Sequence, residues 1–434
     1  MLSILVPHVT PRISYTMDLL FGQILLLPYQ ILSSVETLPE GPLVNYSAQH
    51  AGQGVSIPNL GLLEESDIRP QYPVIRHAAI PHLFATEDTG TDLTFDLFSA
   101  VFFLVSEYEK YLEPPLDAHQ RYDASKLLSA ELSLDRLPLV HLYALYLWRK
   151  LQGAYRGKDL PGLPSPQFDF RITIDVDNPW KYLHKGVGIA LGGAGKDVLH
   201  GRWGQLLERI RTHFNKKDPY DTFDELFVLC PPDKTQFFFL LDRHSPFDSR
   251  FFPKTPAYRH LMQEIRRKGY RCGIHPSYTT PLNPSRLNSE KEALEAVLGE
   301  EITHSRQHFL RYKLPETFRS LQAMGIRDEF SSCLFQSGGF PAGMAQPYPW
   351  FDLEKNEQTD LMLWPTHIMD RSLEQYLGLS PDQALDHFQT IVNGCRIVGG
   401  TFVLLIHNDA LSESEEWKGW SQTIRSMISY LTNL

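Results

Sequence analysis

The sequence predicts an α/β protein in which a smaller mixed α/β domain precedes a larger domain of parallel strands. After about residue 163, segments typical of strands alternate with segments typical of helices, which indicates right-handed parallel units. The strand segments are nearly continuous apolar runs, as expected when helices cover both faces of a sheet. No Gly-rich phosphate loop follows a predicted strand. The segment "LGGAGK" at 191–196 is rich in glycine, but it lacks the spacing of such a loop. A barrel and an open doubly wound sheet both remain candidates.

The first part of the chain indicates a small domain that ends in helices. Residues 1 to about 85 mix short apolar runs with Pro, Gly and Ser turns. Residues 93–112 are apolar on nearly every side and predict a buried helix, and 132–152 predict an amphipathic one. The segment 157–167 is rich in Gly and Pro and predicts a linker. We therefore expect one domain over 1–162 and a second over 163–434.

The second part predicts seven strands separated by helices. The expected strands are 170–176, 235–242, 270–275, 303–309, 326–332, 361–367 and 401–407. The expected helices are 201–214, 255–269, 289–299, 315–325, 381–394 and 415–431. This alternation is the pattern of repeated strand–helix units.

Composition narrows the class of protein. The formal net charge of -10 argues against a nucleic-acid partner, which usually meets a basic surface. Four cysteines without paired spacing fit a reducing compartment. The apolar stretches are shorter than the ~20 residues that span a bilayer, and the first residues lack the charged region of a signal peptide. We expect a cytoplasmic enzyme with no membrane span.

Polar residues follow nearly every expected strand, at the point where it ends. They are Asp175 and Asp177, Asp242 and His244, His275, Arg306 and His308, Asp328, His367 and Asp370, and His407 with Asn408 and Asp409. In a barrel of parallel strands the carboxyl ends converge on one face, where active sites lie. A structural role explains any single residue, such as an acid that caps the next helix, but it explains the whole pattern poorly.

The residue types suggest a metal site with acid–base chemistry. Two close carboxylates, Asp175 and Asp177, repel each other unless a cation neutralises one. His275 stands in "CGIHPSY", two residues after Gly273 and directly before a Pro-Ser turn, so its ring is expected to face the site. His308 is either a metal ligand or a hydrogen-bonding residue. His407 ends the most apolar strand and suits a general acid, because the pKa of histidine lies near neutrality.

Residues from about 168 to 434 resemble the polysaccharide deacetylases, the carbohydrate esterases with a NodB-homology barrel. The resemblance rests on "TIDVD", "GIHPSYTT", "SRQHFLR" and "LLIH", in this order along the chain. It implies a distorted seven-stranded (β/α) barrel that removes acetyl groups from N-acetylated sugars with one divalent metal, usually zinc. The whole chain is similar to an uncharacterised bacterial branch with an extra N-terminal domain, in which a helix like 96–111 recurs.

The resemblance also implies roles for individual residues. Asp175 is the expected base, Asp177 and His275 are metal ligands, Arg306 supports the base and His407 is the acid. The family's second motif has another histidine four residues on, where this chain has Thr279. His308 is therefore expected to be the third ligand, with His244 as another candidate. The chain also has Pro341 where this branch is expected to have an arginine.

We therefore expect a metal-dependent hydrolase that removes an acyl group from an amino sugar or glycan. The expected partners are a carbohydrate substrate and a second copy of the chain in a homodimer. Trp180, Trp350 and Trp364 are candidates for stacking on sugars or for the core. Because of the two departures, the alternative is an inactive deacetylase-like barrel that binds carbohydrate or acts as a scaffold. A metal hydrolase for phosphoesters or cyclic amides is the third possibility.

Overall fold

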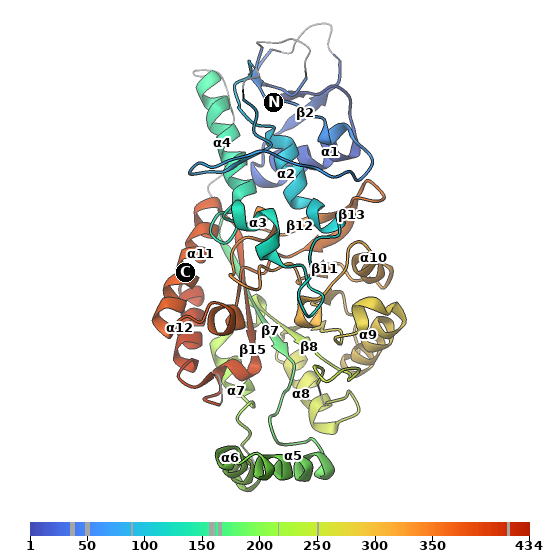
Figure 1. The fold of residues 1–434 in the computed structure, drawn as a ribbon, viewed down its shortest axis with the longest axis vertical. Helices are drawn as coiled ribbons and strands as arrows, with labels where there is room; N and C mark the ends of the chain where they lie inside the picture. The colour runs from blue at the N-terminus through green and yellow to red at the C-terminus, as the bar shows by residue number, and fades with distance from the viewer. Residues whose placement is uncertain are drawn as a thin grey trace. The chain divides into compact units, whose positions relative to one another are not determined.

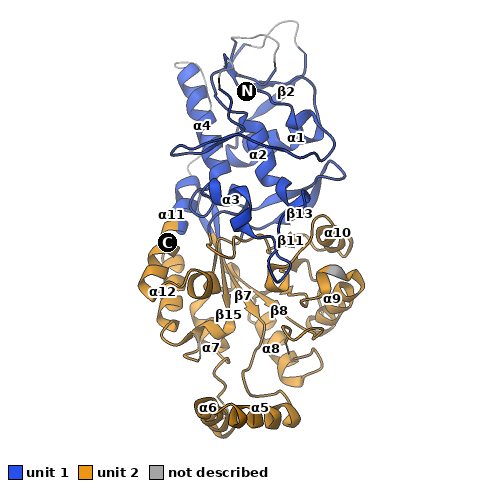
Figure 2. Cartoon of the chain, viewed as in Figure 1, with its two compact units in different colours: residues 1–169, 339–365, 391–402 blue, residues 170–338, 366–390, 403–434 orange. Residues whose placement is uncertain are grey.

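The computed structural model describes residues 1–34, 40–47, 53–87, 90–155, 160, 162–163, 167–215, 217–249, 251–414 and 417–434. The chain forms two compact units (Figure 2). Unit 1 comprises 1–169, 339–365 and 391–402, and unit 2 comprises 170–338, 366–390 and 403–434. Most of the predicted linker, 157–167, lies outside the described residues. The division into domains 1–162 and 163–434 stays a proposal.

Unit 1 contains a parallel four-stranded sheet with the order β2-β1-β3-β4. Its strands are β1 (Leu2–Leu5), β2 (Tyr29–Leu32), β3 (Leu43–Asn45) and β4 (Val55–Ser56). The helices of this unit include α1 (Pro11–Met17), α2 (Leu97–Val105), α3 (Leu128–Glu131) and α4 (Leu139–Ala154). Every residue of α2 is buried, as its apolar sequence predicts.

Helix α2 begins where a buried carboxylate caps it. Asp96 accepts hydrogen bonds from the backbone N–H of Ser99 (2.9 Å) and of Leu60 (2.8 Å) and from the hydroxyl of Tyr46 (2.9 Å). These bonds satisfy donors at the helix start and tie it to a distant loop. Burial raises the pKa of Asp96 to about 6, although the hydrogen bonds oppose the shift.

Short strands complete unit 1 and correct one prediction. β5 (Ile75–Arg76) pairs with β6 (His82–Leu83), and β12 (Tyr348–Asp352) pairs antiparallel with β13 (Glu357–Leu363). The predicted strand 361–367 is wrong, because its first residues end β13 and a separate strand begins at Ile368. Pro365 explains the break, since proline has no N–H to donate to a ladder.

Unit 2 contains seven strands in the order β11-β10-β9-β8-β7-β15-β14. They are β7 (Asp169–Val176), β8 (Thr235–Phe239), β9 (Arg271–Ile274), β10 (His304–Ser305), β11 (Asp328–Glu329), β14 (Ile368–Met369) and β15 (Thr401–His407). β7 to β11 pair in parallel, as do β14 and β15. A parallel bridge between Cys333 and Thr366 joins the segment that follows β11 to the segment that precedes β14.

Helices follow most of these strands, so the mixed α/β class is confirmed. They are α5 (Val187–Leu199), α6 (Trp203–Asn215), α7 (Phe223–Leu229), α8 (Pro256–Arg267), α9 (Pro284–Leu298), α10 (Glu316–Ala323), α11 (Pro381–Val398) and α12 (Ser421–Thr432). Figure 1 shows α8, α9 and α12 around β7, β8 and β15. The sequence did not predict α5 or α7, and residues 191–196 lie inside α5.

The predicted strand 303–309 is wrong beyond its start. β10 ends at Ser305, and His308–Leu310 form a 3-10 turn. Phe309 and Leu310 both have positive φ angles, 60° and 57°, which β-strand residues do not adopt. This turn carries His308.

Within the described part of the chain, we find no helix that combines the length and the apolar character needed to cross a bilayer.

The buried cap of α2 predicts a pH-dependent stability. The pKa of Asp96 rises from 3.8 to about 6 on folding, so the folded protein binds more protons than the unfolded one between these values. The contribution of this group is therefore complete below pH 3.8 and is lost as the pH rises through 6. Two pKa units correspond to about 3 kcal/mol.

In Asp96→Asn, which cannot ionise, this loss should be absent when the free energy of unfolding is measured in urea at pH 4, 5, 6 and 7. Asp92→Asn removes an exposed carboxylate of the same unit and should keep the wild-type profile. Parallel profiles for Asp96→Asn and the wild type would contradict the assignment.

Candidate metal and catalytic site

The end of β7 places two carboxylates in one region of unit 2. Residues two apart on an extended chain point to the same side, so Asp175 and Asp177 share a direction. The Nε2 atom of His275 lies 3.7 Å from Oδ2 of Asp175 and 3.3 Å from Oδ1 of Asp177. Pro179 follows two residues later and prevents the strand from continuing. The pair predicted from the sequence is therefore brought together.

Arg306 holds Asp175 in place. Its Nη1 donates to Oδ1 of Asp175 at 2.9 Å, its Nη2 to the hydroxyl of Thr366 at 3.1 Å, and its Nε to the carbonyl of Phe330 at 3.2 Å. The guanidinium also lies over the ring of Phe238, 4.8 Å from its centroid. The fully buried arginine thus has one fixed geometry, and its charge compensates the buried carboxylate.

The backbone of Arg306 also orients His275. The Nδ1 atom of His275 lies 2.6 Å from the carbonyl oxygen of Arg306, so Nδ1 carries the proton that it donates. Nε2 then faces Asp177. Two residues before this histidine the strand tolerates no side chain, because a Cβ on Gly273 would lie 2.6 Å from the ring of Phe238.

His308 reaches the same point from the 3-10 turn after β10. Its Nε2 lies 3.7 Å from Oδ2 of Asp177, and its Nδ1 lies 3.3 Å from Oδ1 of Asp248. Asp248 in turn accepts the backbone N–H of Tyr278 at 2.6 Å and that of His244 at 3.0 Å. A carboxylate fixed by backbone donors therefore orients the second imidazole.

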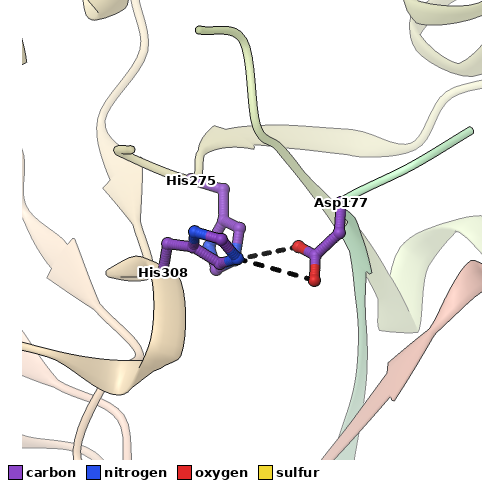
Figure 3. Close-up of side chains that lie close together, drawn as sticks. All are labelled: Asp177, His275 and His308. Atoms are coloured by element: carbon purple, nitrogen blue, oxygen red, sulfur yellow. Dashed lines mark ion pairs between the residues drawn. The ribbon is translucent and has the colours of Figure 1, made fainter. Parts of the chain in front are cut away.

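Asp177, His275 and His308 together form a group that fits a metal ion (Figure 3). One ligand atom from each lies within 4.8 Å of the others. Oδ1 of Asp177 is buried and accepts no hydrogen bond from any residue that the structure describes. Both imidazoles use Nδ1 for a carbonyl or carboxylate partner, the arrangement that metal-ligating histidines usually have. Two imidazoles and one carboxylate are a common ligand set of catalytic zinc.

The charges of the three residues depend on one another. Burial opposes ionisation of Asp177, but the imidazoles of His308 and His275 hold its pKa well below the ordinary value. Burial likewise opposes the imidazolium form of His308, but Asp177 and Asp248 outweigh it and raise the pKa to about 9. A metal ion bound here would therefore replace a proton on His308.

His407 also lies close to Asp177 and is paired with a buried acid. Its Nε2 is 3.9 Å from Oδ2 of Asp177, and its Nδ1 is 2.9 Å from Oδ1 of Asp370. The backbone N–H of His407 donates to Oδ2 of Asp370 at 2.7 Å. Burial opposes the charged imidazole, but Asp370 raises its pKa to about 9. His407 is thus protonated near neutral pH and its Nε2–H faces the metal-binding group.

Other strand-end residues lie elsewhere. Nε2 of His244 is 3.2 Å from Asp242 and 3.9 Å from Glu290, a separate group. Glu290 accepts hydrogen bonds from the hydroxyl and the backbone N–H of Ser277 and from the hydroxyl of Thr280, so it already has a structural role.

The remaining predicted residues have structural partners. His367 accepts the backbone N–H of Val403 at its Nδ1, and Asp328 lies 3.5 Å from His304. Thr279, which stands where the family's second histidine would be, accepts a hydrogen bond from Arg286.

Two further aspartates and two of the three candidate tryptophans show what the sequence could and could not predict. Asp370 and Asp248 were not assigned roles, although the position of Asp370 close behind a predicted strand end was a usable signal. Asp248 lies in a loop and carries no such signal. Trp180 is buried and donates its indole N–H to Asp221, and Trp350 is fully buried, so neither presents a face to a sugar.

Comparison with known proteins leaves the family open. A family model described as a family of unknown function (DUF7033) matches residues 2–156, less than half of the chain. No curated protein matches the sequence.

Several solved structures are similar to part of the chain. A polysaccharide deacetylase from Bacillus cereus, Bc1974, is 10% identical, covers 60% of this chain and 87% of its own, and has a TM-score of 0.31. A CE4 family pseudoenzyme from Bacillus anthracis, BA3943, is 10% identical with 62% and 61% covered and a TM-score of 0.31. Puue allantoinase is 9% identical with 64% and 92% covered and a TM-score of 0.38. The neighbours thus include both a deacetylase and a pseudoenzyme.

The site geometry predicts one metal equivalent. Purified wild-type protein should bind one Zn²⁺ or Co²⁺, measured by elemental analysis and by calorimetric titration after chelation. Asp177→Ala and His308→Ala each remove a ligand and should abolish stoichiometric binding. Asp248→Asn removes the carboxylate that orients His308 and should weaken affinity about 10- to 100-fold.

The matched control is His244→Ala, which removes the histidine of the separate group with Asp242 and Glu290. It should keep wild-type stoichiometry. If His244→Ala lost the ion and Asp177→Ala kept it, the metal would belong to the group of Asp242, His244 and Glu290, and the assignment made here would be wrong.

Proposed function

We propose that this chain is a metal-dependent hydrolase that removes an acyl group, acetyl in the first instance, from an amino sugar or glycan. The observation that carries the proposal is that two buried ion pairs lie close to the candidate metal ligands Asp177, His275 and His308. Asp175, paired with Arg306, lies 3.7 Å from His275 of this group. His407, paired with Asp370, lies 3.9 Å from Asp177. This arrangement supplies a base, an acid and a cation site within one small region.

The fold supports the same proposal. The strands of unit 2, with a bridge between the segments next to β11 and β14, are compatible with a distorted (β/α) barrel of the NodB type. The site residues follow the carboxyl ends of β7, β9, β10, β14 and β15. Active sites of parallel barrels lie at this face.

Asp177, His275 and His308 would hold one divalent ion, and we propose zinc. When bound, such an ion polarises the acyl oxygen and lowers the pKa of a coordinated water. The imidazoles contribute their Nε2 lone pairs, because their Nδ1 atoms are committed to the carbonyl of Arg306 and to Asp248.

Asp175 acts as the general base. Its carboxylate takes the proton of the attacking water, while the water oxygen forms a bond to the acyl carbon. Arg306 places its positive charge beside the carboxylate and fixes its direction through the 2.9 Å hydrogen bond. The buried surroundings of Asp175 exclude competing water.

His407 acts as the general acid. Its Nε2–H transfers a proton to the leaving nitrogen or oxygen of the sugar as the acyl carbon releases it. Asp370 positions the ring through Nδ1 and through the backbone N–H, and it stabilises the protonated form. The proton gained by Asp175 and the one lost by His407 balance over one turnover.

An inactive barrel that binds carbohydrate or acts as a scaffold is the second candidate. It is favoured by Thr279, which occupies the place of the second family histidine and is engaged with Arg286. In this case the protein would lack stoichiometric metal and turnover. A hydrolase of phosphoesters or cyclic amides is the third candidate, and a panel of acetylated sugars and model phosphoesters separates it from the first.

Asp175→Asn tests the base. The amide cannot accept the water proton, so turnover of an acetylated glycan should fall by about 10²- to 10⁴-fold, the contribution of a general base. Metal content should stay near one equivalent, because Asp177 and both imidazoles remain. Release of acetate is measured together with bound metal. Wild-type turnover in this variant would remove Asp175 from the mechanism.

Asp370→Asn tests the residue that positions the acid. Turnover should fall about 10- to 100-fold, because Nδ1 of His407 loses its charged partner. In the double variant with His407→Ala, the loss should be no greater than that of His407→Ala alone, since the two residues act as a unit. Additive losses, measured as ratios of kcat/KM, would show that Asp370 acts independently of His407.

A further inference from the structure

The connection between β7 and α7 contains a helical hairpin whose apolar side faces outward. Helices α5 and α6 form it, directly after the segment that carries Asp177. Figure 1 shows both helices standing away from the strands β7, β8 and β15 of the same unit. Nothing in the proposed hydrolysis uses this hairpin.

Each helix carries a stripe of exposed apolar side chains. On α6 the spacing is four, three and four residues, which places the side chains on one face. The stripes consist of Val187, Leu191 and Val198 on α5, and of Trp203, Leu207, Ile210 and Phe214 on α6; Ile189 and Leu199 on α5 are exposed as well. Trp203 is 60% exposed and Phe214 is 83% exposed. Amphipathic helices of globular proteins normally turn such a stripe inward.

Polar groups occupy the inside of the hairpin instead. Asp197 on α5 is buried and accepts two hydrogen bonds from the guanidinium of Arg209 on α6, at 2.9 and 3.1 Å. That guanidinium also packs against Gly193, where a Cβ would lie 2.7 Å from it. The two helices are therefore joined by an ion pair, which leaves their apolar stripes without a partner inside the hairpin.

Polar contacts also attach the hairpin to unit 2. Glu208 accepts hydrogen bonds from Lys181 at 2.8 Å and from the hydroxyl of Tyr182 at 2.7 Å. A cavity of about 980 Å³ lies against α6, lined in part by Glu208, Thr212 and Asp218. The apolar stripes are thus not required to hold the hairpin to the fold.

The charge of the hairpin is opposite to that of the chain. Residues 185–215 contain five Lys or Arg and two acidic residues, whereas the chain has a formal net charge of -10. Both acids are engaged with bases, Asp197 with Arg209 and Glu208 with Lys181. Lys196 and Arg211 are exposed and form no ion pair with any described residue. With five basic and two acidic residues, the hairpin therefore carries a formal net charge of +3.

We infer that this hairpin docks on an anionic lipid bilayer. Exposed Trp, Phe and Leu beside Lys and Arg are the features of helices that lie in a membrane interface. A helix of 13 residues is about 20 Å long, so α6 would lie in the plane of the interface. A second copy of the chain fits less well, because two hairpins of the same positive charge would repel each other. The inference stands independently of the hydrolase activity.

Vesicle sedimentation with the full chain tests the inference. Wild-type protein should pellet with vesicles of phosphatidylcholine containing phosphatidylglycerol, and much less with phosphatidylcholine alone. Trp203→Ser with Phe214→Ser removes two large apolar groups and should weaken partitioning by at least about tenfold. Lys196→Glu with Arg211→Glu should weaken binding to the anionic vesicles and abolish its salt dependence.

The control is Val228→Ser, which also removes an exposed apolar side chain but lies on α7, outside the hairpin, and should bind as the wild type does. Circular dichroism confirms that each variant is folded. Wild-type protein that stays in the supernatant with anionic vesicles would overturn the inference. Sedimentation velocity adds a second check. If the wild type is a dimer that does not bind vesicles, and Trp203→Ser with Phe214→Ser makes it monomeric, the stripes belong to an interface with a second copy.

Discussion

The site depends on the commitment of each imidazole's Nδ1 to a buried acceptor. His275 donates to the carbonyl of Arg306, His308 to Asp248 and His407 to Asp370. Each bond directs the remaining nitrogen, Nε2, toward Asp177. Without these acceptors the rings could rotate or change tautomer, and the carboxylate would face no ordered set of nitrogens.

The same arrangement solves the problem of burying charge. Asp175 and Asp370 are almost completely buried, and each has a cationic partner, Arg306 and His407. A second buried acid, Glu329, lies near Arg306, and burial raises its pKa to about 7, although hydrogen bonds from Ser305 and Ser331 oppose the shift. Because Glu329 ionises less readily, the charge of Arg306 remains available to Asp175. The interior thus tolerates several acids that apolar surroundings alone would force to be neutral.

Much of the fold and of the site could be predicted from sequence because both depend on local patterns. Apolar runs indicated the strands, and the polar residue after each run indicated Asp175, Asp177, His275 and His407. The structure brings these residues together. The prediction failed where tertiary context decided the outcome. His308 lies on a turn with positive φ angles after a two-residue strand, and no periodic pattern indicates such a turn.

Three further failures have physical causes. The sequence predicts one strand over 361–367, but Pro365 divides this segment. Its first part pairs in an antiparallel hairpin. Asp248 had no signal, because its role depends on a hydrogen bond across 60 residues of sequence. The hairpin of α5 and α6 was predicted only in part, since the Gly-rich sequence of α5 has low helix propensity.

An anomalous-scattering map from crystals of the Co²⁺-loaded protein tests the central claim most directly. The account predicts one strong peak in contact with the carboxylate of Asp177 and with Nε2 of His275 and His308. A map without a peak there, or with its only peak at Asp242, His244 and Glu290, would contradict it.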